Sequence, residues 1–254
     1  ITVAFFVMFG FFFLITQYLQ FGRGYSPLEA GLATLPLALS FLVFSPRSAA
    51  LAERYGASRV MALGLTIVAV GFGILTLLTP DTPYLVVAAA FTILGAGMSI
   101  TAAPATSEIM TSVPLSKAGV GSAVNDTTRE LGGALGIALL GSIANTAYRS
   151  GVDLEQVRLP AGAREAAGES IGSASAIAER IPGGGGEVVA QAASAFTNAF
   201  TLTNTVAMGI ALAAAAAVLA VSRRSGGDTV EADVADEDAI DLELLPVGAG
   251  EMRE

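Results

Sequence analysis

The sequence predicts an all-α polytopic membrane protein, and three observations lead to that fold class. Of the 254 residues, 53% are hydrophobic and only 14% are charged, whereas about 25% of the residues of a soluble domain are charged. The apolar residues gather in runs of about 20 residues, the length at which a helix crosses a bilayer. The runs are too long for membrane strands and lack a period of two. The six predicted spans lie near residues 1–21, 28–46, 60–79, 84–110, 119–148 and 198–222.

The segments between the spans carry residues that cap or interrupt helices. Ser26 can cap the second span, Pro27 suits its first turn, and Glu29 can return to the amide of the cap. The segment 149–197 is rich in Ala, Gly, Ser and Glu. We expect it to be a long extracytoplasmic loop with one weak helix, too poor in large apolar residues to form a core. Its glycine run at 183–186 lacks the other residues of a phosphate-binding loop and is typical of a flexible linker.

The formal net charge of −9 belongs mainly to one end of the chain. Residues 223–254 hold ten acidic and three basic side chains, and we expect them to form a disordered cytoplasmic tail. Residues 1–148 hold six side chains of each sign, so the body is neutral and sparsely charged. No basic patch with interleaved aromatic residues occurs, so the sequence gives no reason to expect nucleic acid as a partner.

The basic residues predict the orientation of the spans. By the positive-inside rule, the loops after the second and fourth spans and the segment after the sixth are cytoplasmic. These segments hold Arg47, Arg54, Arg59, Lys117, Arg223 and Arg224. The short loops on the opposite side hold only Arg23, although the long loop adds arginines there. Those arginines are Arg149, Arg158, Arg164 and Arg180.

The absence of Cys, His and Trp excludes many kinds of chemistry. Thiolate or imidazole metal sites, cysteine nucleophiles, Ser-His-Asp triads and His-ligated haem cannot be built from this chain. We therefore expect no enzyme activity, no metal site and no cofactor. The partner that the composition does imply is a lipid bilayer.

Charged residues inside the spans are the first functional candidates, because a charge in the bilayer is costly and usually faces a cavity or a partner. This intramembrane charge cluster consists of Glu108, Asp126, Arg129 and Glu130. Asp126 and Arg129 are three residues apart and share a helix face, while Glu108 can reach Arg129 from the preceding span. Two interpretations stay open. Either the first turns of the fifth span protrude into the cytoplasmic interface, or the cluster is a charge relay or gate latch.

Polar and small side chains inside the spans form two further groups. The candidates for lining a water-filled cavity are Thr16, Gln17, Tyr18, Gln20, Ser99 and Thr101. Alternatively, the hydroxyls bond their own helix backbone, and Tyr18 belongs to an interfacial aromatic belt. The candidates for close helix packing are Gly132, Gly133 and Gly136, which include a G-x-x-x-G motif.

Several stretches resemble one family of transporters. They are residues 18–20 (YLQ), 24–31 (GYSPLEAG), 35–36 (LP), 119–123 (GVGSA), Arg129 and 131–138 (LGGALGIA). In this order and spacing they resemble the first helix junction and the penultimate helix in the C-terminal half of fourteen-helix drug:proton antiporters. That family belongs to the major facilitator superfamily. The resemblance covers about residues 1–222.

A looser match lies in the loop after the second span. Its residues include Glu53, Arg54, Gly56 and Arg59. The stretch is similar to the cytoplasmic loop motif of the superfamily, G-x-x-x-D-R-x-G-R/K, although Ala49 and Glu53 replace the first Gly and the Asp. We expect a tight turn with charge contacts to a helix end.

The resemblance implies a six-helix half, built from two three-helix repeats, that rocks against a missing N-terminal half around a midplane site. It implies proton-coupled efflux of drug-like amphipathic compounds across the cytoplasmic membrane by alternating access. In that architecture the first and fourth helices line the cavity. The second and fifth face the other half, which would place the glycines near 132–136 at the interface between halves. The acids that couple protons in this family lie largely in its N-terminal part.

Two other functions stay open on the residues alone. One is the export or facilitated transport of another small solute, since a fold does not fix a substrate. The other is a structural or regulatory role without a translocation pathway. The chain begins at Ile1 inside an apolar run with no positively charged region ahead of it. We therefore expect no signal peptide and expect the chain to be a piece of a longer protein.

Overall fold

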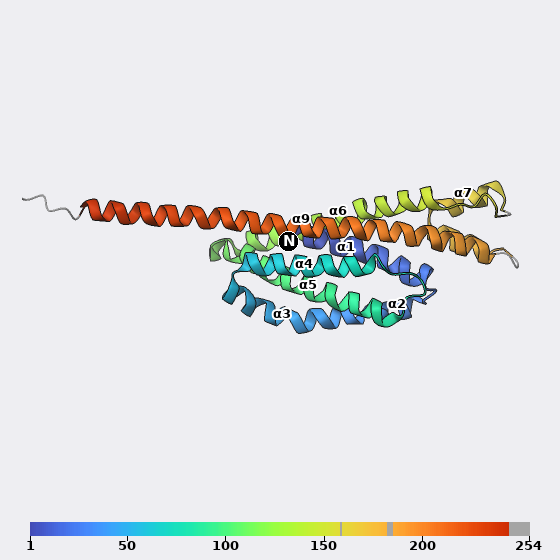
Figure 1. Ribbon diagram of the computed structural model, residues 1–254, viewed down its shortest axis with the longest axis horizontal. Coiled ribbons are helices and arrows are strands. Elements are labelled where there is room, and N and C mark those ends of the chain that lie inside the picture. The colour runs from blue at the N-terminus through green and yellow to red at the C-terminus, as the bar shows by residue number, and fades with distance from the viewer. Residues whose placement is uncertain (158, 182–184, 244–254) are drawn as a thin grey trace, which may run out of the picture.

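The structure, a computed structural model, describes residues 1–157, 159–181 and 185–243, with side chains described as far as Arg223. Every regular element in these ranges is a helix. Six helical segments there are long and apolar enough to cross a membrane. The predicted all-α fold class with six spans is therefore confirmed. Figure 1 shows the helices running roughly side by side, with α9 extending beyond the bundle.

The first three spans are formed by α1 (Thr2–Gln17), a π-helical turn η1 (Tyr18–Gly22), α2 (Pro27–Ala33), α3 (Leu35–Tyr55) and α4 (Ala57–Leu75). The predicted cap of the second span is confirmed. The backbone N–H of Glu29 donates to Oγ of Ser26 at 3.3 Å, and the N–H of Ser26 donates to Oε2 of Glu29 at 2.8 Å. This reciprocal pair satisfies two amides that a helix start leaves without partners.

The last three spans are formed by α5 (Tyr84–Thr111), α6 (Ala118–Gly151) and α9 (Gly185–Glu243). A short 3₁₀ turn, η2 (Leu115–Lys117), precedes α6. Two short helices, α7 (Ala161–Glu169) and α8 (Ile171–Ala178), lie between α6 and α9.

The packing of the spans repeats between the two halves of the chain. The first span, α1, packs on the fifth, α6, and the fourth span, α5, packs on the second, α3. The third and sixth spans, α4 and α9, pack on each other. These three contacts are unchanged when spans one to three are exchanged with spans four to six, whereas the contact of α4 with α5, the most extensive in the bundle, has only a smaller counterpart between α9 and α1. Such a pattern is the one expected of two three-helix repeats.

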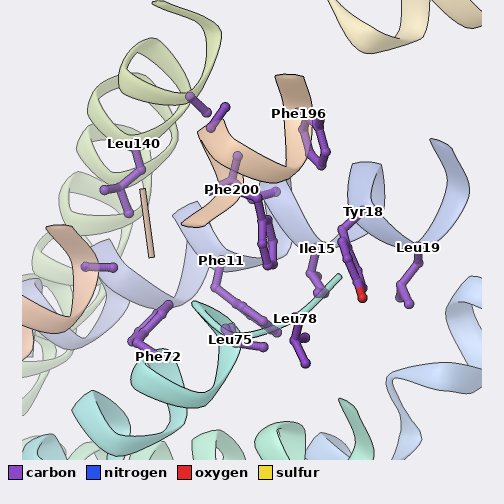
Figure 2. Packing of buried hydrophobic residues seen from close by; sticks show 14 of the residues in the cluster. Phe11, Ile15, Tyr18, Leu19, Phe72, Leu75, Leu78, Leu140, Phe196 and Phe200 are labelled. Atoms are coloured by element: carbon purple, nitrogen blue, oxygen red, sulfur yellow. The ribbon is translucent and has the colours of Figure 1, made fainter. Parts of the chain in front are cut away.

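Aromatic side chains fill the centre of the bundle, where α1, α4 and α9 meet (Figure 2). The ring of Phe11 on α1 lies edge-on to Phe72 and Phe91, with centroids 6.2 Å and 5.6 Å away. The ring of Tyr18 stacks on Phe200 of α9 at 4.9 Å. Edge-to-face and offset contacts of this kind add to the effect of burial, so the core fixes α1 against α4, α5 and α9.

Glycines allow the closest helix crossings. A Cβ atom on Gly97 of α5 would lie 2.8 Å from the carbonyl oxygen of Gly64 on α4, and a Cβ on Gly64 would lie equally close to Gly97. On α6, a Cβ on Gly136 would overlap the carbonyl oxygen of Phe6 on α1. Backbones at this distance leave no room for any side chain, so these positions require glycine.

The segment 149–197 is more ordered than the loop that the sequence predicts. It includes the end of α6, both α7 and α8, and the first turns of α9. Leu154, Val157 and Ile171 are buried there, and the hydroxyl of Tyr148 donates to the carbonyl oxygen of Ala167 at 2.9 Å. The expectation that this segment has no core is wrong. The buried apolar surface comes from the loop after α6, from α8 and from the first turns of α9, and small alanines let the short helices pack closely on α9.

The acidic tail also differs from its expected disorder over part of its length. Helix α9 continues from the sixth span to Glu243. Residues 244–254 of the predicted tail, and residues 182–184 of the predicted glycine linker, lie outside the described part of the chain.

Replacing Gly136 by Ala is expected to destabilise the bundle. The new methyl group would lie 2.9 Å from Cα of Phe6 and closer still to its carbonyl group, and overpacking of this kind costs about 1–3 kcal/mol. Gly209→Ala is the matched control, because a Cβ at Gly209 has open space around it. The midpoint of thermal unfolding of each variant in detergent, monitored by size-exclusion chromatography, measures the difference in stability. Equal midpoints for the two variants would contradict the close α1–α6 crossing.

Candidate functional site

The polar residues at the end of α1 separate into an exposed group and a buried residue. Thr16 is exposed, and its Oγ1 donates to the carbonyl oxygen of Phe12 at 2.8 Å. Gln17 and Gln20 are half-buried. Tyr18 is completely buried, and its hydroxyl donates to the carbonyl oxygen of Thr79 at 2.7 Å. Tyr18 therefore belongs to the core, and the accessible polar groups here are Thr16, Gln17 and Gln20.

The polar residues predicted to line a cavity from α5 lie inside the protein. Ser99 and Thr101 are buried and donate to their own helix, to the carbonyl oxygens of Ala96 at 3.0 Å and Gly97 at 2.9 Å. A Cβ atom on Gly64 of α4 would overlap Oγ1 of Thr101. Thr101 therefore lies in the contact between α4 and α5, and neither hydroxyl faces open space in this conformation.

A polar contact that the sequence reasoning missed links α5 to α6. Asn125 is buried, and Oγ1 of Thr106 donates to its Oδ1 at 3.3 Å. Nδ2 of Asn125 donates to Oδ1 of Asp126, also at 3.3 Å. Its signal in the sequence is an amide next to the charged residue Asp126 inside a predicted span.

The charged residues of the predicted cluster point to different surroundings. Glu108, Asp126 and Glu130 are exposed. Arg129 is half-buried, and its Cζ lies 4.5 Å from the ring centroid of Phe5 on α1, a cation–π geometry. Nε of Arg129 is buried without a hydrogen-bond partner among the described residues. The predicted pairing of Arg129 with a carboxylate is therefore not the arrangement in this conformation.

The loop motif forms a tight junction between α3 and α4. Gly56 is the only residue between the two helices, and its φ of 86° is a conformation that L side chains rarely adopt. Glu53, Arg54 and Arg59 are exposed, and Cζ of Arg54 lies 5.3 Å from the ring centroid of Tyr55. Glu53 also lines a cavity of about 200 Å³, together with Glu108 of α5. The tight turn that the motif predicts is thus present, and the cavity beside it is lined by one carboxylate from α3 and one from α5.

The glycines of α6 do not lie where the resemblance places them. Gly132 and Gly136 are buried against the backbone of α1, at Thr2 and Phe6. Gly133 lies against the ring of Phe9, where a Cβ would be 3.1 Å from the ring. The expectation that these glycines face another half of the protein is therefore wrong. They lie within the contact of the first and fifth spans.

Comparison with known proteins decides the family. The Major Facilitator Superfamily profile matches residues 1–137, more than half of the chain. The chain belongs to the major facilitator superfamily. It is thus a multi-pass membrane protein, and membership points to a transporter rather than an enzyme.

The chain is similar to exporters and resistance proteins of bacteria. It is 37% identical to the multidrug efflux pump LfrA of Mycolicibacterium smegmatis over 220 residues, which cover 85% of this chain and 43% of that protein. It is 31% identical to the methyl viologen resistance protein SmvA of Salmonella typhimurium, covering 80% of this chain and 40% of that protein. It is also 31% identical to the tetracenomycin C resistance and export protein of Streptomyces glaucescens, with 83% and 40% covered. The chain spans about two fifths of these relatives.

Replacing Gly56 by Ala is expected to lower the free energy of unfolding of this protein by about 1–3 kcal/mol, because a side chain is strained at a φ of 86°. Gly31→Ala is the control, since Gly31 is exposed and helical and a Cβ there has open space. Thermal unfolding of the two variants in detergent measures the effect. If Gly56→Ala is as stable as Gly31→Ala, the tight junction does not depend on glycine.

Proposed function

We propose that the chain is the C-terminal six-helix half of a fourteen-helix drug:proton antiporter in the cytoplasmic membrane. The complete protein would export amphipathic organic compounds by alternating access, with the α3–α4 junction on the cytoplasmic side. The observation that carries the proposal is the similarity, over about two fifths of their length, to proteins named as multidrug efflux or drug resistance proteins.

The surface of α6 supports the proposal that a second half covers it. Among the candidate spans, the one containing α6 is the least apolar. Its exposed residues include Ser142, Asn145 and Thr146, which are poor partners for lipid. Protein or a water-filled cavity suits this surface better. In a complete transporter of this family, the fifth helix of a half faces its mate.

The exposed end of α1 supports the proposed cavity. Thr16, Gln17 and Gln20 offer hydroxyl and carboxamide groups beside the exposed rings of Phe12 and Phe13. A surface that combines rings with a few neutral polar groups suits amphipathic compounds. No acid of this chain is proposed as the proton-coupling group, because the family places those acids mainly in its N-terminal part.

Dye export by the complete protein tests the proposal. Inverted membrane vesicles that carry the complete protein are expected to accumulate ethidium when a proton gradient, acid inside, is imposed. A protonophore is expected to abolish the accumulation. Vesicles that carry only residues 1–254 should show none, and coexpression with the upstream half should restore it. Accumulation that ignores the protonophore would refute proton antiport, and no accumulation by the complete protein would refute drug export.

Replacing Arg129 by Ala is expected to abolish ethidium export by the complete protein without lowering its abundance. The change removes the cation held over Phe5 at the α1–α6 contact. Arg129→Lys keeps the charge but loses the planar guanidinium, so it is expected to retain partial export. Arg149→Ala, at an exposed position near the opposite end of α6, is the control. Unchanged export by Arg129→Ala would leave only a role at the membrane interface.

A further inference from the structure

A small cavity lies where the end of α1 meets the ordered part of segment 149–197. Its volume is about 120 Å³, and four helices contribute to its walls. Its principal lining residues are Phe13, Gln17, Asn145, Tyr148, Ile171 and Phe196. Three of the six are aromatic, two are carboxamides, and none carries a charge. The spans alone do not enclose it, because Ile171 belongs to α8.

The wall contributed by α8 is held in place by several contacts. The hydroxyl of Ser170 caps the helix by accepting from the N–H of Ser173 at 3.2 Å. The ring of Phe21 lies against Gly172, where a Cβ would be 3.5 Å from it. At the preceding turn, the hydroxyl of Tyr148 donates to the carbonyl oxygen of Ala167. The cavity is therefore preformed, which lowers the entropic cost of filling it.

Most polar groups at the cavity already have partners within the protein. The hydroxyls of Tyr148 and Ser170 are used as described, and Nε2 of Gln17 donates to the carbonyl oxygen of Phe13 at 3.3 Å. Oε1 of Gln17 and the amide of Asn145 have no hydrogen-bond partner within the described part of the chain, and Asn145 is exposed and lines the cavity. Carboxamide oxygens accept hydrogen bonds, so a ligand that carries an N–H group would find acceptors at the rim.

We propose that this cavity is an outer subsite that receives one aromatic ring of an exported compound, with Gln17 and Asn145 accepting from an N–H group on that ring. The proposal rests on the proposed export function and names a part of its substrate. The size supports a single ring, because a whole drug-sized ligand needs about 300–1,000 Å³ and an apolar cavity of about 150 Å³ holds benzene. The rings of Phe13 and Phe196 in the cavity wall suit an aromatic cation, since aromatic rings attract positive charge.

Two probes with different chemistry test the subsite in the complete transporter. Ethidium is a planar aromatic cation with amino groups, and dodecyltrimethylammonium is a cation with neither ring nor N–H. Asn145→Leu is expected to raise KM for ethidium about three- to tenfold, the effect of losing one hydrogen bond, while leaving export of dodecyltrimethylammonium unchanged. Asn198→Leu is the control, at an exposed position of α9 that does not line the cavity. It should change neither the KM for ethidium nor the export of dodecyltrimethylammonium. Asn145→Ser provides a smaller change if the leucine variant is poorly folded.

Ethidium binding to the purified complete protein, measured by fluorescence, gives a readout independent of export. Weaker binding by Asn145→Leu with unchanged dodecyltrimethylammonium export supports the subsite. If Asn145→Leu weakens export of both probes equally, or of neither, the subsite is refuted, but the proposal of drug export is not affected. If the unaltered protein exports neither probe, the proposed function fails, and the subsite fails with it.

Discussion

Direct backbone contact at glycines is the constraint on which this bundle depends. Lipid tails are as apolar as the side chains of a span, so membrane helices gain stability from close approach rather than from removal of water. Gly64 and Gly97 bring α4 onto α5, and Gly136 brings α6 onto α1. These crossings fix which face of each helix is internal. They therefore also decide which polar side chains are left for a cavity.

The α1–α6 pair and the pair of α3 with α5 are linked to each other by contacts that involve side chains rather than direct backbone approach. Between them lie the edge-on rings of Phe11 and Phe91 and the hydrogen bond from Thr106 to Asn125. A buried amide with a partner specifies one arrangement more strongly than an apolar contact does, because an unpaired amide is costly. Such a bundle suits a half that moves as one body, as the proposed alternating access requires.

The sequence was sufficient for features that depend on local properties. The length of the apolar runs identified the six spans, and the Ser26–Glu29 pattern identified a helix cap. Features that depend on which neighbour covers a helix face were not predictable. Ser99 and Thr101 have the polarity of cavity residues, but both are buried, and α4 covers Thr101. The order in segment 149–197 was missed because alanine carries little apolar signal, although it is buried readily between closely packed helices.

Helix lengths bear on the two interpretations of the charge cluster. In the proposed orientation, segment 149–197 lies outside the membrane. Tyr148 of α6 contacts that segment through Ala167, so the proposed membrane-crossing part of α6 ends before it. Counting back about 20 residues, the length of a span, gives residue 128 as its start. Asp126 then lies on the water side, which agrees with its exposure, and Arg129 lies at the boundary. There the ring of Phe5 can replace part of the hydration that the guanidinium loses, because arginine is weakly hydrated and stacks on aromatic faces. At this position Arg129 contacts α1 through Phe5 and has no carboxylate partner among the described residues, which argues against a charge relay.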